Sequence, residues 1–596
     1  MAELVADYVL KRLREWGVDR IYGYPGDGIN AFLGALDRAE EEGGPEFIQA
    51  RHEEMAAFMA CGHGKFAGED RIGVCMATSG PGAVHLLNGL YDAKLDHVPV
   101  LAIVGQQKRS SLGSSYQQEI DLQTLYKDVA EYVETCMVPA QARHLIDRAI
   151  RISLDRRCVS AIIVPNDVAE EPAVESPPRA HGSVYSAVGY RRPRIVPREE
   201  DVQHAAEILN EGEKVAILIG QGARGAVSEI EQVADLLGAG VAKALLGKDV
   251  LADHLPYVTG SIGLLGTIPS TDMIAGCDTL LMVGTTFPYA EFLPKEGQAR
   301  CVEINIDASM IGIRYASEVM LVGDAKESLQ ALMPHLIRKA DRGWRQKIEK
   351  GVSSWWKIVE ERALQDASPM NPQRVAHELS EVLPDDAIIT ADSGSSTNWY
   401  ARQVKLKQGN LASLSGTLAT MVPGVPYAIA AKFAHPDRPV ICFVGDGAFQ
   451  MLGMNEMLTV KRYMDRWQDK RLIFCVFNNQ DLNQVTWEQR VMEGDPKYPG
   501  SQWLPNLDYA AYGKLCGLEG LMCDSGDEMR GAWERALASD RPVVLEVRTD
   551  PEVPPLPPHI TFEQAKKMAK AMRTDPERVG VMEKSVRGKL VEFLKG

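Results

Sequence analysis

The sequence of 596 residues contains no apolar run near the roughly 20 residues that a membrane-spanning helix needs. It also lacks a basic excess, since its net charge of −16 opposes the phosphate contacts on which nucleic-acid binding depends. Its ten cysteines form no Cys-x-x-Cys pair, which disfavours zinc sites and disulfides and indicates small core residues in a reduced compartment. The N-terminal stretch ending at Gly17 has the pattern of an amphipathic helix rather than a cleaved signal. We therefore expect a cytoplasmic protein with no nucleic-acid partner.

The composition is that of a large globular protein, with 45% apolar and 24% charged residues. Its length predicts about three domains. Strand-like runs (98–104, 159–164) alternate with helical patterns (142–154), which predicts an α/β fold of three doubly wound domains with mostly parallel sheets. The expected segments are a first domain at 1–170, a linker at 171–198, a central domain at 199–337, a connecting helix at 338–370, a third domain at 371–552 and a helical tail at 553–596.

Two apolar runs in the third domain end in polar residues. Residues 441–444 lead into Gly445-Asp446-Gly447, and residues 472–477 lead into Asn478-Asn479. In a parallel sheet such strand ends can lie side by side at the edge where ligands bind. Carboxylate and amide oxygens suit Mg²⁺, and glycines let backbone amides approach a diphosphate. The pattern therefore predicts an anchor for a metal and a diphosphate.

This pattern resembles the signature of thiamine diphosphate enzymes, and further motifs are similar to their pyruvate oxidase and acetolactate synthase branch. The resemblance covers nearly the whole chain, through residues 51–55 (RHEEM), 78–82 (TSGPG), 88–92 (NGLYD), 96–100 (DHVPV) and 419–421 (ATM). It implies that the first domain binds the aminopyrimidine of the cofactor and that the third binds its diphosphate and Mg²⁺.

The resemblance assigns roles to individual residues. Glu53 would hydrogen-bond the aminopyrimidine from an apolar place, although two exposed helix glutamates are the alternative interpretation. Asp446 and Asn479 would ligate Mg²⁺ through side-chain oxygens and Asp481 through its carbonyl, where a helix cap and a turn are the alternatives. Met421 would hold the cofactor bent, unless it is a core methionine. The other residues expected at this cofactor are Pro25, Gly26, Gly80, Asn88, Gly394, Ser395, Ser396, Thr420, Gly445, Gly447 and Ala448.

The central domain is similar to the FAD-binding segments of pyruvate oxidases. Glycines after strand-like runs can approach a pyrophosphate, and a carboxylate after a strand can hold a ribose hydroxyl. FAD is therefore an expected cofactor, bound by Gly220, Gly222, Arg224, Gly284, Thr285, Asn305, Asp307 and Asp324.

The expected substrate pocket departs from that of the relatives. Gln117 and Gln118 stand in place of a Phe-Gln pair, and Gln484 stands where pyruvate oxidases have an aromatic residue. Amides offer hydrogen bonds where relatives offer apolar surface, which favours a larger or more polar 2-oxo acid than pyruvate. The residues expected to be catalytic are Glu53, Asp27, Gln118, Gln484 and Glu488.

The resemblance implies oxidative decarboxylation of a 2-oxo acid with FAD as electron acceptor and a quinone or oxygen beyond it. An acetolactate synthase-like carboligase, with structural or absent FAD, is the alternative, and a non-catalytic scaffold is a more remote one. By the same resemblance, the first domain of one subunit and the third domain of its partner close each active site. A homodimer or homotetramer is therefore expected.

The Lys-rich tail places Val581, Met582, Val586, Leu590, Phe593 and Leu594 on one helical face. This pattern favours a helix packed on its own subunit or a neighbour. It is also compatible with weak contact at the inner face of a membrane, since quinone-reducing pyruvate oxidases use such a tail.

Overall fold

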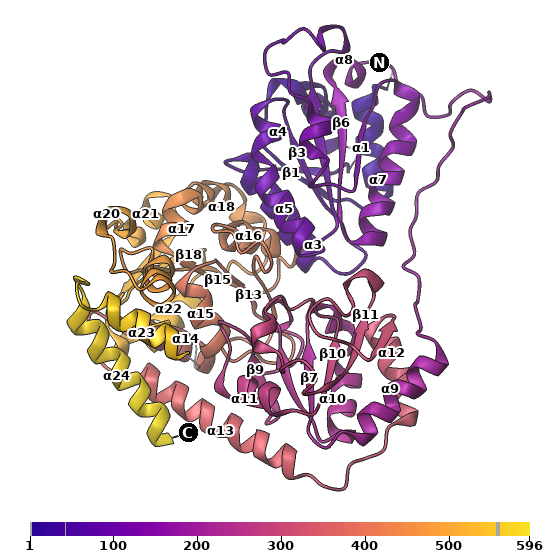
Figure 1. Ribbon diagram of the computed structural model, residues 1–596. Coiled ribbons are helices and arrows are strands. Elements are labelled where there is room, and N and C mark those ends of the chain that lie inside the picture. Colours follow the sequence, from indigo (N-terminus) through magenta and orange to yellow (C-terminus); the bar gives the residue numbers. More distant parts are fainter. Residues whose placement is uncertain (1–2, 42, 556–560, 596) are drawn as a thin grey trace.

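The computed structural model describes residues 3–41, 43–555 and 561–595, which form three domains (Figure 1). Each domain carries one six-stranded sheet in which all strands are parallel. The α/β class and the three parallel-sheet domains expected from the sequence are therefore confirmed. Helices cover both faces of each sheet, as alternating βα patterns require.

The first and third sheets have the same strand order relative to the chain. The first runs β2 (Glu46–Gln49), β1 (Arg20–Gly23), β3 (Gly73–Ala77), β4 (Val100–Gln106), β6 (Val159–Pro165), β5 (Tyr132–Thr135). The third runs β14 (Leu411–Ser413), β13 (Ile388–Ala391), β15 (Val440–Gly445), β16 (Leu472–Asn478), β18 (Val543–Arg548), β17 (Glu519–Cys523). The strand order reverses between β1 and β3 in the first sheet and between β13 and β15 in the third. In open α/β sheets, ligands bind at such a reversal of the strand order.

The central sheet has a different order. It runs β9 (Val258–Ser261), β8 (Gly240–Lys243), β7 (Val215–Ile219), β10 (Thr279–Val283), β11 (Arg300–Asn305), β12 (Val319–Val322). This order, 3-2-1-4-5-6, is that of dinucleotide-binding domains, and its reversal lies between β7 and β10. The helices are α9 (Glu199–Glu211), α10 (Val227–Leu236) and α12 (Ala325–Leu332) on one face and α11 (Ile268–Gly276) on the other.

Alternate residues of the first sheet enter two separate cores. Ile21 and Met76 pack with α1 (Val5–Glu15), α2 (Asn30–Glu40) and α7 (Ala142–Arg156), whereas Tyr22 and Cys75 pack with α3 (Glu53–Phe66) and α5 (Leu87–Leu95). This is the period of two that a strand buried on both faces requires.

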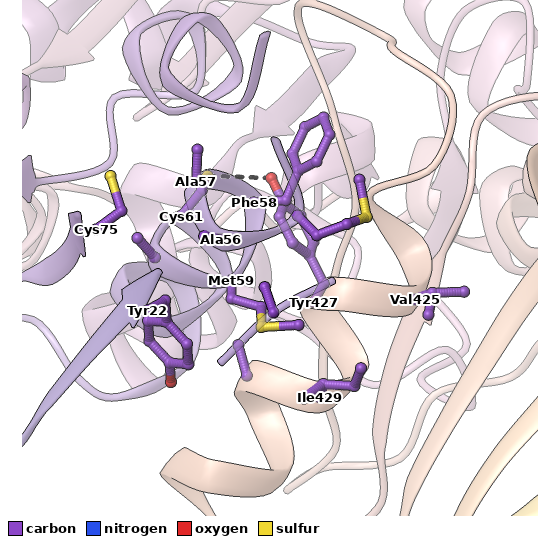
Figure 2. Close-up of a cluster of buried hydrophobic side chains, with 14 of the residues drawn as sticks. Tyr22, Ala56, Ala57, Phe58, Met59, Cys61, Cys75, Val425, Tyr427 and Ile429 are labelled. Atoms are coloured by element: carbon purple, nitrogen blue, oxygen red, sulfur yellow. Dashed lines mark hydrogen bonds between the residues drawn. The ribbon is translucent and has the colours of Figure 1, made fainter. Parts of the chain in front are cut away.

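The first and third domains of one chain share a core through α3 and α16 (Gly424–Ala434), shown in Figure 2. Small residues permit the close approach, since a Cβ on Gly62 would lie 3.0 Å from Tyr427 Cα. Phe58 meets the Tyr427 ring edge-on at 6.4 Å, and Cys61 Sγ lies 3.1 Å from Tyr427 Oη. The two domains are thus held in one fixed orientation within the chain.

Segments outside the domains are pinned by side-chain contacts. The segment at 171–198 has no helix or strand and runs along one side of the molecule (Figure 1), where Asp324 accepts the Ile195 N–H at 2.8 Å. The connecting helix α13 (Gly343–Ala363) begins five residues later than expected. Arg338 and Arg342 both form ion pairs with Asp235 of α10. These pairs attach the segment before α13 to the central domain.

The tail forms two helices, α23 (Phe562–Ala571) and α24 (Arg578–Lys595), that pack on their own chain. Between them, Asp575 accepts two hydrogen bonds of 2.8 Å from Arg490. The predicted apolar face is divided: Val581 is buried against Trp487, whereas Met582, Val586 and Leu590 are exposed. The side chains of Phe593 and Leu594 lie outside the described part of the chain.

Two short helices begin or end at candidate site residues, α4 (Pro81–His85) and α17 (Asp446–Ala448), and further helices of the third domain are α14 (Pro372–Val382), α15 (Ser395–Gln403), α18 (Met457–Tyr463), α19 (Asn483–Glu488) and α22 (Met529–Leu537). All ten cysteines are buried and unpaired, as expected of core residues. Over residues 3–41, 43–555 and 561–595, we find no helix that combines the length and apolar character needed to cross a membrane.

Candidate active site

The carboxyl ends of β15 and β16 bring Asp446 and Asn479 together. The two strands are neighbours in the sheet, and Asp446 directly follows β15. Asp446 is 2% exposed and its carboxylate accepts N–H bonds from Gly447, Asn479 and Gln480 at 2.9, 3.0 and 2.6 Å. Burial nevertheless raises the pKa of Asp446 to about 7. A bound cation would relieve this burial penalty.

Further side-chain and backbone oxygens follow β16, next to Asp446. Asn479 Oδ1 accepts the Asp481 N–H at 3.0 Å, which closes a tight turn. The Asp481 carboxylate is occupied by Thr486 Oγ1 at 2.9 Å and Lys497 Nζ at 3.1 Å. The backbone carbonyl of Asp481 accepts the Asn483 N–H at 2.7 Å and has a second lone pair that a cation could use. The residues present therefore fit a hard divalent cation with oxygen ligands.

The N-terminus of α15 faces the same space. Gly394 precedes α15 with φ 122°, a conformation that favours glycine, and a Cβ there would meet no atom within 4 Å. A Cβ on Gly445 would also stand in open space. Helix N-terminal N–H groups favour anions, so this cradle fits a diphosphate beside the cation. A Cβ on Gly447 would lie 3.6 Å from Met421 Cε, which places the Met421 side chain at the edge of this space.

One cavity of about 1740 Å³ is lined by the third and central domains and, at residues such as His97 and Arg157, by the first domain. Its volume exceeds the 300–1,000 Å³ usual for one small-molecule site. Its lining includes every residue predicted at the metal, at FAD and on α19, together with the third-domain residues predicted at the diphosphate cofactor except Thr420: Asp446, Asn479, Asp481, Gly394, Ser395, Ser396, Met421, Gly445, Gly447, Ala448, Gln484, Glu488, Gly220, Gly222, Arg224, Gly284, Thr285, Asn305, Asp307 and Asp324.

The central glycines pack against one another at the chain reversal. Gly220 and Gly222 follow β7, Gly284 follows β10, and the Gly222 N–H donates to the Gly284 carbonyl at 3.0 Å. A Cβ on Gly222 would lie 2.9 Å from Gly284 Cα, and one on Gly220 would lie 2.4 Å from the Gly284 oxygen. These glycines are therefore required for close backbone packing, which in turn shapes the cavity wall.

The polar residues of the central domain are partly engaged within the chain. Arg224 pairs with Asp249 at 3.1 Å, and Asp324 holds the linker through Ile195. Asp307 caps a short helix by accepting the Ser309 N–H at 2.9 Å. All three line the cavity, so a nucleotide would meet both the fixed guanidinium and the carboxylates.

A second group of predicted residues surrounds Thr78 in the first domain. Thr78 Oγ1 accepts the Gly28 N–H at 2.8 Å and lies 3.3 Å from Asp27 Oδ1. A Cβ on Gly26 would lie 2.5 Å from Thr78 Cβ, and Pro25 precedes it. Gln118 and Glu53 complete the group from other segments of the chain. A Cβ on Gly80 would lie 2.7 Å from Gln118 Cβ, and a Cβ on Gly82 would lie 3.3 Å from Glu53 Oε1.

The Glu53 side chain contacts His85, whose ring packs beside that of His52. His85 Nδ1 is 3.0 Å from Glu53 Oε2, and the rings of His52 and His85 lie 4.4 Å apart. His52 Nδ1 accepts the Glu54 N–H, while burial and His85 lower the pKa of His52 and favour its neutral form. The three side chains offer ligand atoms within 4.8 Å of one another, so they form a polar site that a cofactor ring or a metal could contact.

The two groups do not share one cavity within one chain. Over the described residues, the lining of the large cavity excludes Glu53, Asp27, Pro25, Gly26, Gly80 and Gln118. Asn88 and Thr420 also lie outside it, at the contact between domains, where Asn88 Nδ2 donates to Thr420 Oγ1 at 3.2 Å and to Glu54 Oε1 at 2.7 Å. The candidate site is therefore divided into a first-domain half and a half shared by the central and third domains.

Comparison with known proteins identifies the family. The sequence matches the N-terminal thiamine pyrophosphate-binding domain of thiamine pyrophosphate enzymes at residues 4–125, their central domain at 202–332 and their C-terminal thiamine pyrophosphate-binding domain at 392–547. A putative thiamine pyrophosphate-containing protein, YdaP, of Bacillus subtilis is 37% identical over 560 residues, 94% of each chain. The chain belongs to the thiamine diphosphate enzyme family.

Two further relatives place it in the pyruvate oxidase and acetolactate synthase branch. The pyruvate oxidase of Lactiplantibacillus plantarum is 33% identical over 76% of this chain and 74% of its own. A probable acetolactate synthase large subunit of Methanocaldococcus jannaschii is 30% identical over 93% of both chains. The protein is thus a thiamine diphosphate-dependent enzyme of this branch.

Sequence reasoning missed two residues of this thiamine diphosphate enzyme. His85 contacts Glu53, but a single histidine in residues 81–85 carried no spacing signal. Asn398 donates to Gln484 Oε1 at 2.7 Å and lines the cavity. Its position four residues after Gly394, one helical turn into α15, was the available signal.

Proposed function

We propose that this enzyme catalyses the oxidative decarboxylation of a 2-oxo acid with thiamine diphosphate, Mg²⁺ and FAD. The observation that carries the proposal is the single cavity into which both the metal anchor and the dinucleotide-type switch point open. When bound, thiamine diphosphate supplies a nucleophilic carbon and an electron sink, and FAD supplies a two-electron acceptor. A shared cavity is the arrangement that electron transfer between them requires.

The third domain would position the cofactor. Asp446, Asn479 and the Asp481 carbonyl would hold Mg²⁺ against the diphosphate, with the N-terminus of α15 on its other side. Asp446 is fixed by three backbone N–H groups, so its oxygens keep their place without a ligand.

The first domain would supply proton exchange. Glu53 is 9% exposed at the first turn of α3, and its Oε2 meets His85. A carboxyl group there can give a proton to, or take one from, a ring nitrogen within hydrogen-bond reach. Apolar residues 55–61 behind it exclude water from that side.

A complete site would need two copies of the chain, in which Glu53 of one faces the metal half-site of the other. Exposed apolar side chains border both halves, with Tyr24, Val84 and Tyr116 near the first and Met451 and Val485 near the second. Burying such patches is the usual driving force for a stable dimer.

The test is an anaerobic visible spectrum of the purified protein with thiamine diphosphate and Mg²⁺, before and after a panel of 2-oxo acids. Flavin that bleaches as CO₂ is released supports the oxidase. Thiamine diphosphate binding without CO₂ release from any 2-oxo acid contradicts the proposal.

A carboligase is the second candidate, favoured by the acetolactate synthase relative, whose match covers 93% of the chain against 76% for the pyruvate oxidase. The close packing of Gly220, Gly222 and Gly284 would serve a structural FAD equally well. CO₂ release with flavin that stays oxidised, and a C–C bonded product, would select this candidate.

A further inference from the structure

A chain of hydrogen bonds, in which each side chain donates to the next, ends in the large cavity. Arg402 Nη2 donates to Asn398 Oδ1 at 3.4 Å, Asn398 Nδ2 donates to Gln484 Oε1 at 2.7 Å, and Gln484 Nε2 donates to Glu488 Oε1 at 2.9 Å. Asn398, Gln484 and Glu488 line the cavity beside the metal ligands.

The two ends of this chain determine its direction. Arginine can only donate and an ionised glutamate can only accept, so each amide between them has one favourable orientation. Arg402 is itself held in place, because it also donates to the Pro555 and Leu264 carbonyls at 2.9 and 2.7 Å. Asn398 is 2% exposed and cannot turn to water for another partner. Gln484 is therefore fixed with both ends of its amide at the cavity wall.

The first-domain half-site has a similar chain. Gln107 Nε2 donates to Ser79 Oγ at 3.1 Å, and Ser79 Oγ donates to Gln118 Oε1 at 3.4 Å. Gln118 has φ 61°, a left-handed conformation that strains a non-glycine residue and that is concentrated at functional sites. With Oε1 committed to Ser79, the donor end of this amide is the one left for a ligand.

We propose that these two fixed amides, Gln484 and Gln118, select a 2-oxo acid that carries a hydroxyl group on its side chain, with Asn398 as the positioning residue for Gln484. The inference rests on the proposed function and on assembly of the two half-sites. A hydroxyl both donates and accepts, which matches the Gln484 oxygen and the Gln118 N–H. An alkyl group of the same size would desolvate both amides, would leave the Gln118 N–H without a partner and would leave the Gln484 oxygen with Asn398 alone.

The test compares isosteric substrate pairs through the ratio of their kcat/KM values. The pairs are 3-hydroxypyruvate with 2-oxobutyrate and 4-hydroxy-2-oxobutyrate with 2-oxopentanoate, which differ by one hydroxyl in place of a methyl. The wild-type enzyme should favour the hydroxylated member of at least one pair by about tenfold or more, because each unpaired buried polar group costs about 1–3 kcal/mol.

Two variants locate the cause. Asn398→Asp removes the donor to Gln484 at constant shape and reverses the polarity of the chain, and Gln484→Leu removes the amide. Both should bring the ratio towards one, whereas Gln346→Leu, at an exposed position on α13, should leave it unchanged. A loss of folding would lower both rates of a pair together and would not change their ratio.

Ratios at or below one for both pairs in the wild type, or ratios that neither cavity variant changes, would overturn the proposal. Such an enzyme would still decarboxylate 2-oxo acids, so the proposed function would stand. Absence of turnover with every 2-oxo acid would instead overturn the proposed function itself.

Discussion

Glu53 and His85 lie 3.0 Å apart, between the Oε2 and Nδ1 atoms, in the first domain and outside the cavity that Asp446 lines. The carboxylate expected to exchange protons and the carboxylate expected to ligate the metal thus lie in different domains of one chain, and only the second lines the cavity. This separation is the main reason to expect that catalysis requires two copies.

Glu53→Gln should lower decarboxylation by about 10²–10⁴-fold, the usual contribution of a general acid–base group, with thiamine diphosphate still bound. The amide keeps the shape of Glu53 and loses its ability to exchange a proton. Steady-state rates together with calorimetric titration of the cofactor would measure both effects. Glu207→Gln, at an exposed position on α9, is the matched control and should retain full activity. Full activity of Glu53→Gln would remove this residue from the mechanism.

Gly222→Ala should release flavin, because the new Cβ would lie 2.9 Å from Gly284 Cα and 3.0 Å from its oxygen, and backbone cannot move aside cheaply. Gly225→Ala is a control in the same loop, where the nearest atom is Glu69 Oε1 at 3.7 Å. Flavin absorbance per subunit after gel filtration is the readout. Equal flavin content in both variants would show that this loop does not shape the FAD site.

These glycines also show which features of the site could be predicted from the sequence. An apolar run followed by Gly-Asp-Gly is a local pattern, so the strand ends and the position of Asp446 could be predicted. The same reasoning predicts Gly222 at a pyrophosphate, which stays a prediction, and the sequence did not show that the Gly222 backbone also packs against Gly284. A glycine near a ligand and a glycine near another loop have the same local sequence signal.

Contacts between distant segments lay beyond the sequence patterns. The pairing of α3 with α16 depends on Gly62 and Ala430 fitting together, and Glu53, on α3, does not line the cavity that contains Asp446. The hydrogen-bond chain from Arg402 to Glu488 joins α15 to α19 through Asn398 and Gln484, which are 86 positions apart, and no periodicity marks such a pair. The division of the site between two copies was expected from the family resemblance rather than from residue patterns.

The buried carboxyl of Glu456 should make stability depend on pH. Burial raises its pKa to about 7, although Glu456 Oε1 accepts the Arg51 N–H at 2.7 Å. Unfolded glutamate has a pKa of about 4.3, so between about pH 4.3 and 7 the native state binds more protons than the unfolded chain. The stability contributed by this group is therefore present at low pH and is lost as pH rises through about 7.

Glu456→Gln removes this titration. The variant should match the wild type near pH 5 and exceed it at pH 8, by up to about 3 kcal/mol for a pKa change of this size. Tm values of both proteins across this range would measure the difference, with Glu207→Gln as the exposed control. A wild-type and variant difference that stays constant from pH 5 to 8 is incompatible with a protonated Glu456.

Complementation between two inactive variants tests the two-chain site most directly. Glu53→Gln and Asp446→Asn should each inactivate the pure protein, and the two are then unfolded, mixed in equal amounts and refolded, or co-expressed. A mixed dimer would contain one site with both residues intact and one with both replaced. Since half of the dimers are mixed, activity should return to about a quarter of the wild-type value. No recovery, with mixed dimers demonstrated by mass spectrometry, would place Glu53 and Asp446 in the same chain's site and contradict this account.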